Sequence, residues 1–86
     1  MPITRRLASV AEHSRAHVYT IEGHPATIRK TSFGRPGEQD TALIFVEHGQ
    51  DISSRWVAIS KLRPGRNLMR IIRAQDVARD AERAAR

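Results

Sequence analysis

The sequence predicts one small α+β domain, mainly β, in which an antiparallel sheet of four to five strands precedes a C-terminal helix. Residues 17–62 contain four short segments rich in β-branched and aromatic residues, separated by turn-forming Gly, Pro and Asp. The last eleven residues are instead rich in Ala, Arg and Glu, which favour a helix. We therefore divide the single domain, residues 1–86, into an N-terminal segment (1–16), a β core (17–73) and a C-terminal helix (76–86).

The N-terminal segment forms either a short helix or an extended arm. Thr4 is of a residue type that caps helix N-termini, and Leu7, Val10 and Ala11 would share one face of the helix that follows. This apolar stripe is thin for a helix that packs on a sheet, so both structures stay open.

Four strands are expected in the β core, over residues 17–22, 26–33, 41–47 and 53–62. The loop at 34–40 holds two glycines and a proline within seven residues, which is a strong signal for a chain reversal. The third strand contains the unbroken apolar run 42–46, which predicts a central strand covered on both faces.

The chain after Gly65 is ambiguous between strand and helix. In residues 67–73, Leu68-Met69 favours a helix, while Ile71-Ile72 favours a strand, and we predict a fifth strand. One long helix would place Arg79 and Arg83 on the same face as Leu68 and Ile72. We therefore expect a break near residues 74–76 and a new helix that Asp76 caps.

Short strands at this spacing, with a tight turn at 62–65 before the last one, resemble the SH3-like barrels in their order. The resemblance implies an SH3-like partly open barrel as the alternative to a small twisted antiparallel sheet. It is one of architecture, so it implies no function. No motif in the chain is specific to one family.

The balance of charge points to a polyanionic partner. The chain has 86 residues and a net charge of +6, and residues 63–86 carry seven arginines against three carboxylates. A GC-rich genome can explain why arginine outnumbers lysine by 13 to 2, but it does not explain this clustering. The partner expected for such a segment is nucleic acid, either DNA or RNA.

The absence of cysteine excludes disulfides and thiolate metal sites and suits a reducing compartment. No apolar run approaches the ~18 residues of a membrane span, and the first residues lack the apolar core of a secretory signal. We therefore expect a cytoplasmic protein without membrane contact. Because a domain of this size buries little, we also expect a homodimer.

The candidate nucleic-acid-binding residues are arginines and one lysine. Spacings of three, four and three residues bring one group within a single helical quadrant, where like charges are destabilising unless phosphates neutralise them. A second group would widen this surface. The two groups are Arg63, Arg66, Arg70 and Arg73, followed by Arg29, Lys30 and Arg35.

Trp56, the only tryptophan, has two interpretations. A lone tryptophan in a small domain is commonly the centre of the core. Its expected strand neighbours on the same face, Ser54 and Ala58, are small, and an aromatic side chain in such a setting can instead stack on a base. The core interpretation is favoured, and stacking is kept as the alternative.

The sequence around the four histidines does not complete a metal-binding or catalytic site. His13 and His17 have the spacing of a zinc pair on a helix, but no third ligand accompanies them. The loop 34–39 is similar to the Gly- and Pro-rich loop of small basic ribonuclease toxins, some of which are SH3-like barrels. That similarity covers six residues in a different order and assigns no roles. We therefore predict no catalytic residue, no metal and no cofactor.

The function favoured by the sequence is a small, basic, non-enzymatic nucleic-acid-binding protein that contacts phosphates through its C-terminal arginines. The first alternative is a protein–protein interaction or inhibitor factor of a mobile element, in which the arginines dock on an acidic protein surface. The second alternative is a small ribonuclease toxin that uses His24 or His48.

Overall fold

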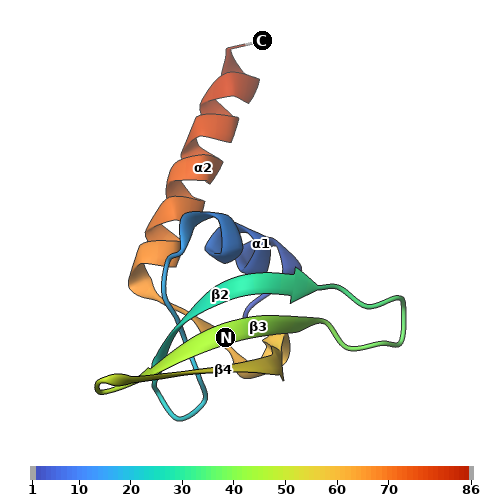
Figure 1. Ribbon diagram of the computed structural model, residues 1–86. Helices are drawn as coiled ribbons and strands as arrows, with labels where there is room; N and C mark the ends of the chain where they lie inside the picture. Colours follow the sequence, from blue (N-terminus) through green and yellow to red (C-terminus); the bar gives the residue numbers. More distant parts are fainter. Residues whose placement is uncertain (1, 86) are drawn as a thin grey trace.

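The computed structural model describes residues 2–85, which form one five-stranded antiparallel sheet with a helix at each end of the chain (Figure 1). Met1 and Arg86, the outermost residues of the predicted segments, lie outside the described residues. In chain order the elements are α1 (Arg5–Ser14), β1 (Val18–Tyr19), β2 (Pro25–Ser32), β3 (Thr41–His48), β4 (Asp51–Ala58), the 3₁₀ turn η1 (Ile59–Lys61), β5 (Arg63–Pro64) and α2 (Arg66–Ala84).

The sheet has the strand order β4-β3-β2-β1-β5, and every neighbouring pair is antiparallel. β1 to β4 follow one another as a meander, and the chain then passes through η1 and returns to place β5 beside β1. β4 and β5 are therefore the two edges of an open sheet. The predicted α+β fold class is confirmed, with five strands, a short N-terminal helix and a C-terminal helix.

α1 begins where Thr4 caps its first turn, because the Thr4 hydroxyl accepts a hydrogen bond from the backbone N–H of Leu7 at 3.3 Å. It ends at Ser14, and the left-handed backbone of the next residue, Arg15 (φ 61°), closes the last turn. Leu7, Ala8 and Ala11 are buried, and the small alanines let the helix lie close to β2. Of the two structures considered for this segment, the helix is confirmed and the extended arm is wrong.

The core lies on one side of the sheet. Side chains alternate between the two faces of a strand, and the side chains on the face toward α1 are fully buried in β2 and β3: Ala26, Ile28, Ala42, Ile44 and Val46. We call the opposite surface the outer face. Register places on it the side chains of Tyr19, Thr27, Lys30, Leu43, Phe45, Glu47, Ile52, Ser54, Trp56 and Arg63.

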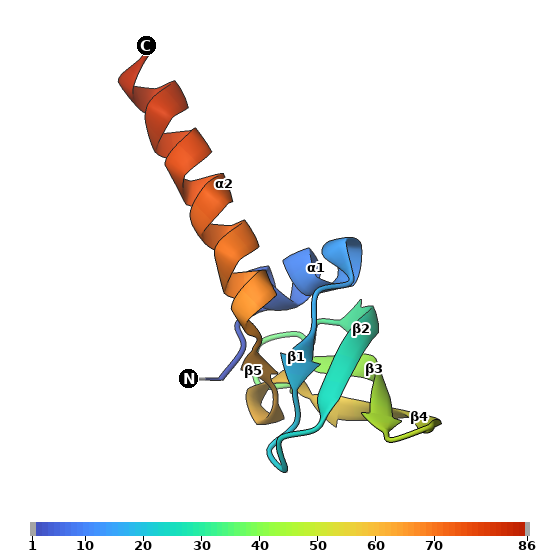
Figure 2. The same cartoon turned by 90° about the vertical axis from the view of Figure 1, so that its left-hand side faces the viewer.

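The prediction that the third strand is covered on both faces is wrong. β3 is central in the strand order, but Leu43 and Phe45 on its outer face are only partly buried, whereas Ile44 between them is completely buried. An unbroken apolar run does not show whether a second layer covers the strand. Here neither helix lies over the outer face (Figures 1 and 2).

The predicted strand at 67–73 and the predicted break at 74–76 are also wrong. Residues 66–84 form one continuous helix, and the fifth strand is the two-residue β5 immediately before it. Leu68 and Ile72 are buried, so tertiary packing overrides the strand preference of the two isoleucines. Beyond Asp76 the helix extends away from the body of the protein (Figure 2), and the face that carries Arg79 and Arg83 therefore meets no core.

Candidate nucleic-acid interface

Three of the predicted arginines share one face of α2. Arg66, Arg70 and Arg73 are exposed and, together with Met69, line a shallow depression on the helix surface. Their spacing of four and three residues turns them away from the buried Leu68, which anchors the helix. The continuous helix thus brings these guanidinium groups together, as the helical alternative for this segment implied.

No carboxylate neutralises these arginines within residues 2–85, where the only ion pairs are Arg5–Asp40, Arg6–Asp76 and His17–Glu47. Asp76, three residues after Arg73, is the nearest acid in the helical sequence. Its Oδ1 instead lies 2.6 Å from Nη2 of Arg6 on α1. The pairing between the two helices therefore leaves the arginine face of α2 positive.

The N-terminal turn of α2 adds to this positive potential. Arg66 and Arg70 lie in the first two turns, where the helix dipole already places positive charge, and the first turn contains no acidic residue. Gly65 occupies the N-cap position and provides no side-chain cap. Cations at this end of a helix are unfavourable in isolation, and a bound anion would relieve their repulsion.

Arg63, the fourth member of the predicted cluster, belongs to the sheet. It pairs in register with Tyr19 of β1, so its side chain lies on the outer face. The predicted group of four is therefore divided between two elements, with one arginine on β5 and three on α2.

Arg29 and Lys30 are brought to the outer face by a β-bulge. The pairing of β2 with β3 shifts between Ile28 and Lys30, so Lys30 lies opposite Leu43. The Arg29 guanidinium carbon lies 4.6 Å from the centroid of the Phe45 ring, which is also on this face. Regular alternation would have separated these two consecutive cations onto opposite faces.

Trp56 is 53% exposed, so the favoured interpretation of it as the centre of the core is wrong. It lies on the edge strand β4, opposite Leu43, and points to the outer face. The core is filled by aliphatic residues of the other face, such as Ile28 and Ile44. Phe45, its neighbour on β3, was not singled out in the sequence because it lies within an apolar run.

Arg35, the third residue of the second predicted group, lies apart from Arg29 and Lys30 and from the arginines of α2. It lies in the loop between β2 and β3, which projects from the end of the sheet (Figure 1), and its backbone N–H donates to Glu38 at 3.4 Å. The loop is held by Asp40, which bonds Arg5 of α1 and the N–H of Gly34. The hydrogen bond from Arg5, helped by that from Gly34, lowers the pKa of Asp40.

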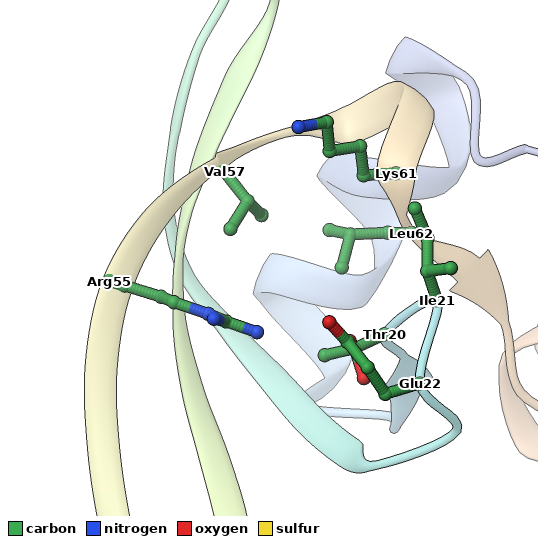
Figure 3. A pocket seen from close by; sticks show the side chains of 7 residues that line it. All are labelled: Thr20, Ile21, Glu22, Arg55, Val57, Lys61 and Leu62. Atoms are coloured by element: carbon green, nitrogen blue, oxygen red, sulfur yellow. The ribbon is translucent and has the colours of Figure 1, made fainter.

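A small cavity of about 150 Å³ opens on the inner side, between the edge strand β4 and the turn after β1 (Figure 3). Arg55 of β4 extends across it toward Glu22. The backbone N–H of Glu22, the hydroxyl of Thr20 and the positive charge of Arg55 lower the pKa of the Glu22 carboxyl. Because ligand pockets commonly measure about 300 Å³ or more, this cavity is small for an organic ligand.

Two of the four histidines are in contact: the rings of His24 and His48 meet edge to face, with centroids 4.6 Å apart. His13 and His17 do not share a helix, because α1 ends at Ser14. Within the described part of the chain, no three side chains of His, Asp or Glu are grouped as metal ligands.

None of the helices described between residues 2 and 85 is both long and apolar enough to cross a membrane. Comparison with protein-family models, with curated proteins and with solved structures found no match for this chain.

Proposed function

We propose that this protein is a non-enzymatic nucleic-acid-binding protein that contacts phosphates through arginines at the start of α2. The observation that supports this most directly is that Arg66, Arg70 and Arg73 line one depression and have no carboxylate partner within residues 2–85. Planar guanidinium groups bind phosphate oxygens with two donors at once.

The proposal includes the cations of the sheet as a second set of phosphate contacts. Arg29, Lys30 and Arg63 share the outer face, where the carboxylate among them, Glu47, lies 3.8 Å from His17. Phosphate contacts position a protein on nucleic acid without reading its sequence. The proposal therefore concerns binding to the backbone, in the cytoplasm, and assigns no target sequence.

A homodimer is part of the proposal. The projecting half of α2 carries Val77, which is 68% exposed, and Ala81 and Ala84 follow it at helical spacing. This uncovered stripe is suited to the same stripe of a second copy, since small side chains let two helices approach closely.

The test compares two double variants that remove equal charge from the same helix. Arg70→Gln/Arg73→Gln changes the proposed site, whereas Arg79→Gln/Arg83→Gln changes the projecting half of α2. Binding of a labelled random-sequence oligonucleotide is measured by fluorescence anisotropy at about 50 mM and about 200 mM salt. Each lost phosphate contact should reduce the slope of log affinity against log salt by about 0.7 on single strands and about 0.9 on duplex.

We expect the first double variant to reduce this slope by about 1.4 to 1.8 and the second to reduce it by less than half as much. No binding at low salt would refute the proposed function. Equal effects of the two double variants would refute the assignment of the site, because net charge alone would then account for binding.

The alternative is docking on an acidic protein surface. It is favoured by a partly apolar groove between α1 and α2, to which Val10 and Ile71 contribute. Competition with polyglutamate distinguishes the two proposals. If the arginines dock on an acidic protein, polyglutamate should displace the labelled oligonucleotide as strongly as unlabelled nucleic acid does. If they recognise phosphate, polyglutamate should displace it more weakly.

A further inference from the structure

We infer that the outer face of the sheet binds unpaired nucleobases, so that the preferred ligand is a single strand of nucleic acid. This inference rests on the proposed function, because it names the kind of nucleic acid that the cations hold. It is based on the side chains that β2, β3 and β4 place together on a surface that no helix covers (Figures 1 and 2).

The first step is the exposure of aromatic and apolar side chains on a folded, uncovered face. Trp56 is 53% exposed, Ile52 is 68% exposed and Tyr19 is 39% exposed, and all three point outward. Exposed large apolar groups that share one face of a small protein mark a binding surface. A flat indole among small neighbours such as Ser54 offers a free π surface on which a base can lie.

The second step is the placement of cations beside these rings. Lys30, Leu43 and Trp56 lie side by side on three adjacent strands, so Lys30 and Trp56 are separated by one strand on the same face. The bulge adds Arg29, whose guanidinium covers the Phe45 ring at 4.6 Å. Guanidinium planes also stack on bases, and the same group can bond the neighbouring phosphate.

The third step is spacing. Phe45 lies opposite Ser54, two residues from Trp56 on β4, so Phe45 and Trp56 are diagonal neighbours. Diagonal neighbours on adjacent antiparallel strands are about 7–8 Å apart between their backbones. One base stacked on Trp56 and another on the Arg29–Phe45 pair can therefore come from the same strand.

The occupant follows from the combination of aromatic rings and positive charge. An apolar protein surface would match the apolar groups, but it would leave the cations Arg29, Lys30 and Arg63 without partners. In a duplex the faces of the bases are stacked on one another, so aromatic side chains reach them only when the strand is unpaired. Unpaired bases with their phosphates satisfy the rings and the cations together.

The experiment uses Trp56 as its own reporter, since it is the only tryptophan in the chain. Strands of about 15 nucleotides, as DNA and as RNA, and the matching DNA duplex are titrated into the protein at low salt. Tryptophan emission and the anisotropy of a label on the nucleic acid are both recorded. We expect either single strand to quench the emission of Trp56 and the duplex to leave it unchanged. Comparison of the DNA and RNA titrations shows which of the two single strands binds more tightly.

The variants Trp56→Ala, Trp56→Phe and Ile21→Ala complete the test. We expect Trp56→Ala to weaken single-strand binding about 5-fold to 100-fold, the range for removal of one base–aromatic stack. Trp56→Phe keeps a ring and should retain most of the affinity. Ile21→Ala removes an exposed apolar group of similar size from the turn after β1, beside the inner cavity and outside the proposed surface, and it should change affinity less than about twofold.

The outcomes separate this inference from the proposed function. If single strand and duplex bind alike, with no quenching and no effect of Trp56→Ala, the inference is wrong while the proposed function stands. If neither nucleic acid binds at low salt, both are wrong. If sedimentation shows self-association that Trp56→Ala abolishes, the outer face joins two copies of the chain and the inference is overturned.

Discussion

Arg5 and Asp40 form a doubly bonded ion pair that ties the first turn of α1 to the loop before β3. Arg5 Nε lies 2.7 Å from Asp40 Oδ2, and Nη2 lies 2.8 Å from Oδ1. The same Nη2 donates to the carbonyl of Gly34, and the N–H of Gly34 donates back to Asp40. The start of α1 and the two ends of the loop 34–40, which is distant from it in sequence, are thereby held at one point on the surface.

This ion pair predicts a loss of stability in acid. The hydrogen bond from Arg5 lowers the pKa of Asp40 in the folded state, whereas the unfolded chain has an Asp pKa of about 3.9. The stabilisation is therefore fully present above the unfolded-state pKa and disappears as pH falls through the lower folded-state value. Urea denaturation of Asp40→Asn should show lower stability than wild type at pH 7 and the same stability in strong acid.

The matched control for this prediction is Glu38→Gln, in the same loop. The Glu38 carboxylate bonds only the backbone N–H of Arg35, at 3.4 Å, among the described hydrogen bonds. Its removal should leave the pH dependence of unfolding close to that of wild type. A constant difference between Asp40→Asn and wild type from neutral pH to strong acid would contradict the stabilising role of the ionised carboxylate.

Gly65→Ala should destabilise the fold by about 1–3 kcal/mol. A Cβ at this position would overlap the carbonyl oxygen of His17, to which the N–H of Gly65 donates at 3.2 Å, and would crowd the Tyr19 ring. Because both clashes occur where β1 meets the start of α2, neither partner can move independently. Urea denaturation measures the loss of stability. The control is Asn67→Ala, which changes an exposed residue in the same helical turn and should stay within about 0.5 kcal/mol of wild type.

The two faces of the sheet should respond differently to truncation of a side chain. Ile44→Ala removes a completely buried side chain and should cost about 2–5 kcal/mol. Trp56→Ala, on the opposite face of the neighbouring strand, should cost less than about 1 kcal/mol although it removes many more atoms. Chemical denaturation followed by circular dichroism reports both values. A larger loss from Trp56→Ala would place this ring in the core.

Deletion of residues 79–86 tests the role of the projecting half of α2. These residues bury no side chain in the described structure, so the shortened chain should keep its fold. If this half joins two copies, the melting temperature of the intact protein rises with protein concentration, whereas that of the shortened chain does not. Sedimentation that shows the same monomeric state for both chains would contradict the dimer.

The first four strands were predictable from the sequence because β-branched residues and turn residues are both local signals. The alternation of Ala42, Ile44 and Val46 with more exposed neighbours follows from the pleat once the strand is placed. The Thr4 cap and the apolar positions of α1 were likewise visible. These local signals therefore identified the first four strands and the candidate helix α1. Whether α1 formed depended on its packing against β2.

The position of α2 and the composition of the outer face depend on tertiary structure. Arg79 and Arg83 suggested a helix break only because the face that they share with Leu68 was assumed to stay buried along its whole length. The bulge that gathers Arg29 and Lys30 has no glycine or proline to signal it. Frequency favours a core position for a lone tryptophan, whereas the exposure of Trp56 is decided by which face of β4 its register with β3 turns toward the core.

The inward position of Arg55 has a consequence for solubility. β4 is an eight-residue edge strand, and such a border offers unsatisfied backbone donors and acceptors to any foreign chain. A charged side chain on the inner face of this edge strand disfavours the pairing of another strand. The added strand would have to place its own apolar side chains beside the Arg55 guanidinium. Arg55, which takes no part in the proposed binding surfaces, would thus disfavour the addition of further strands at β4 and the growth of fibrils.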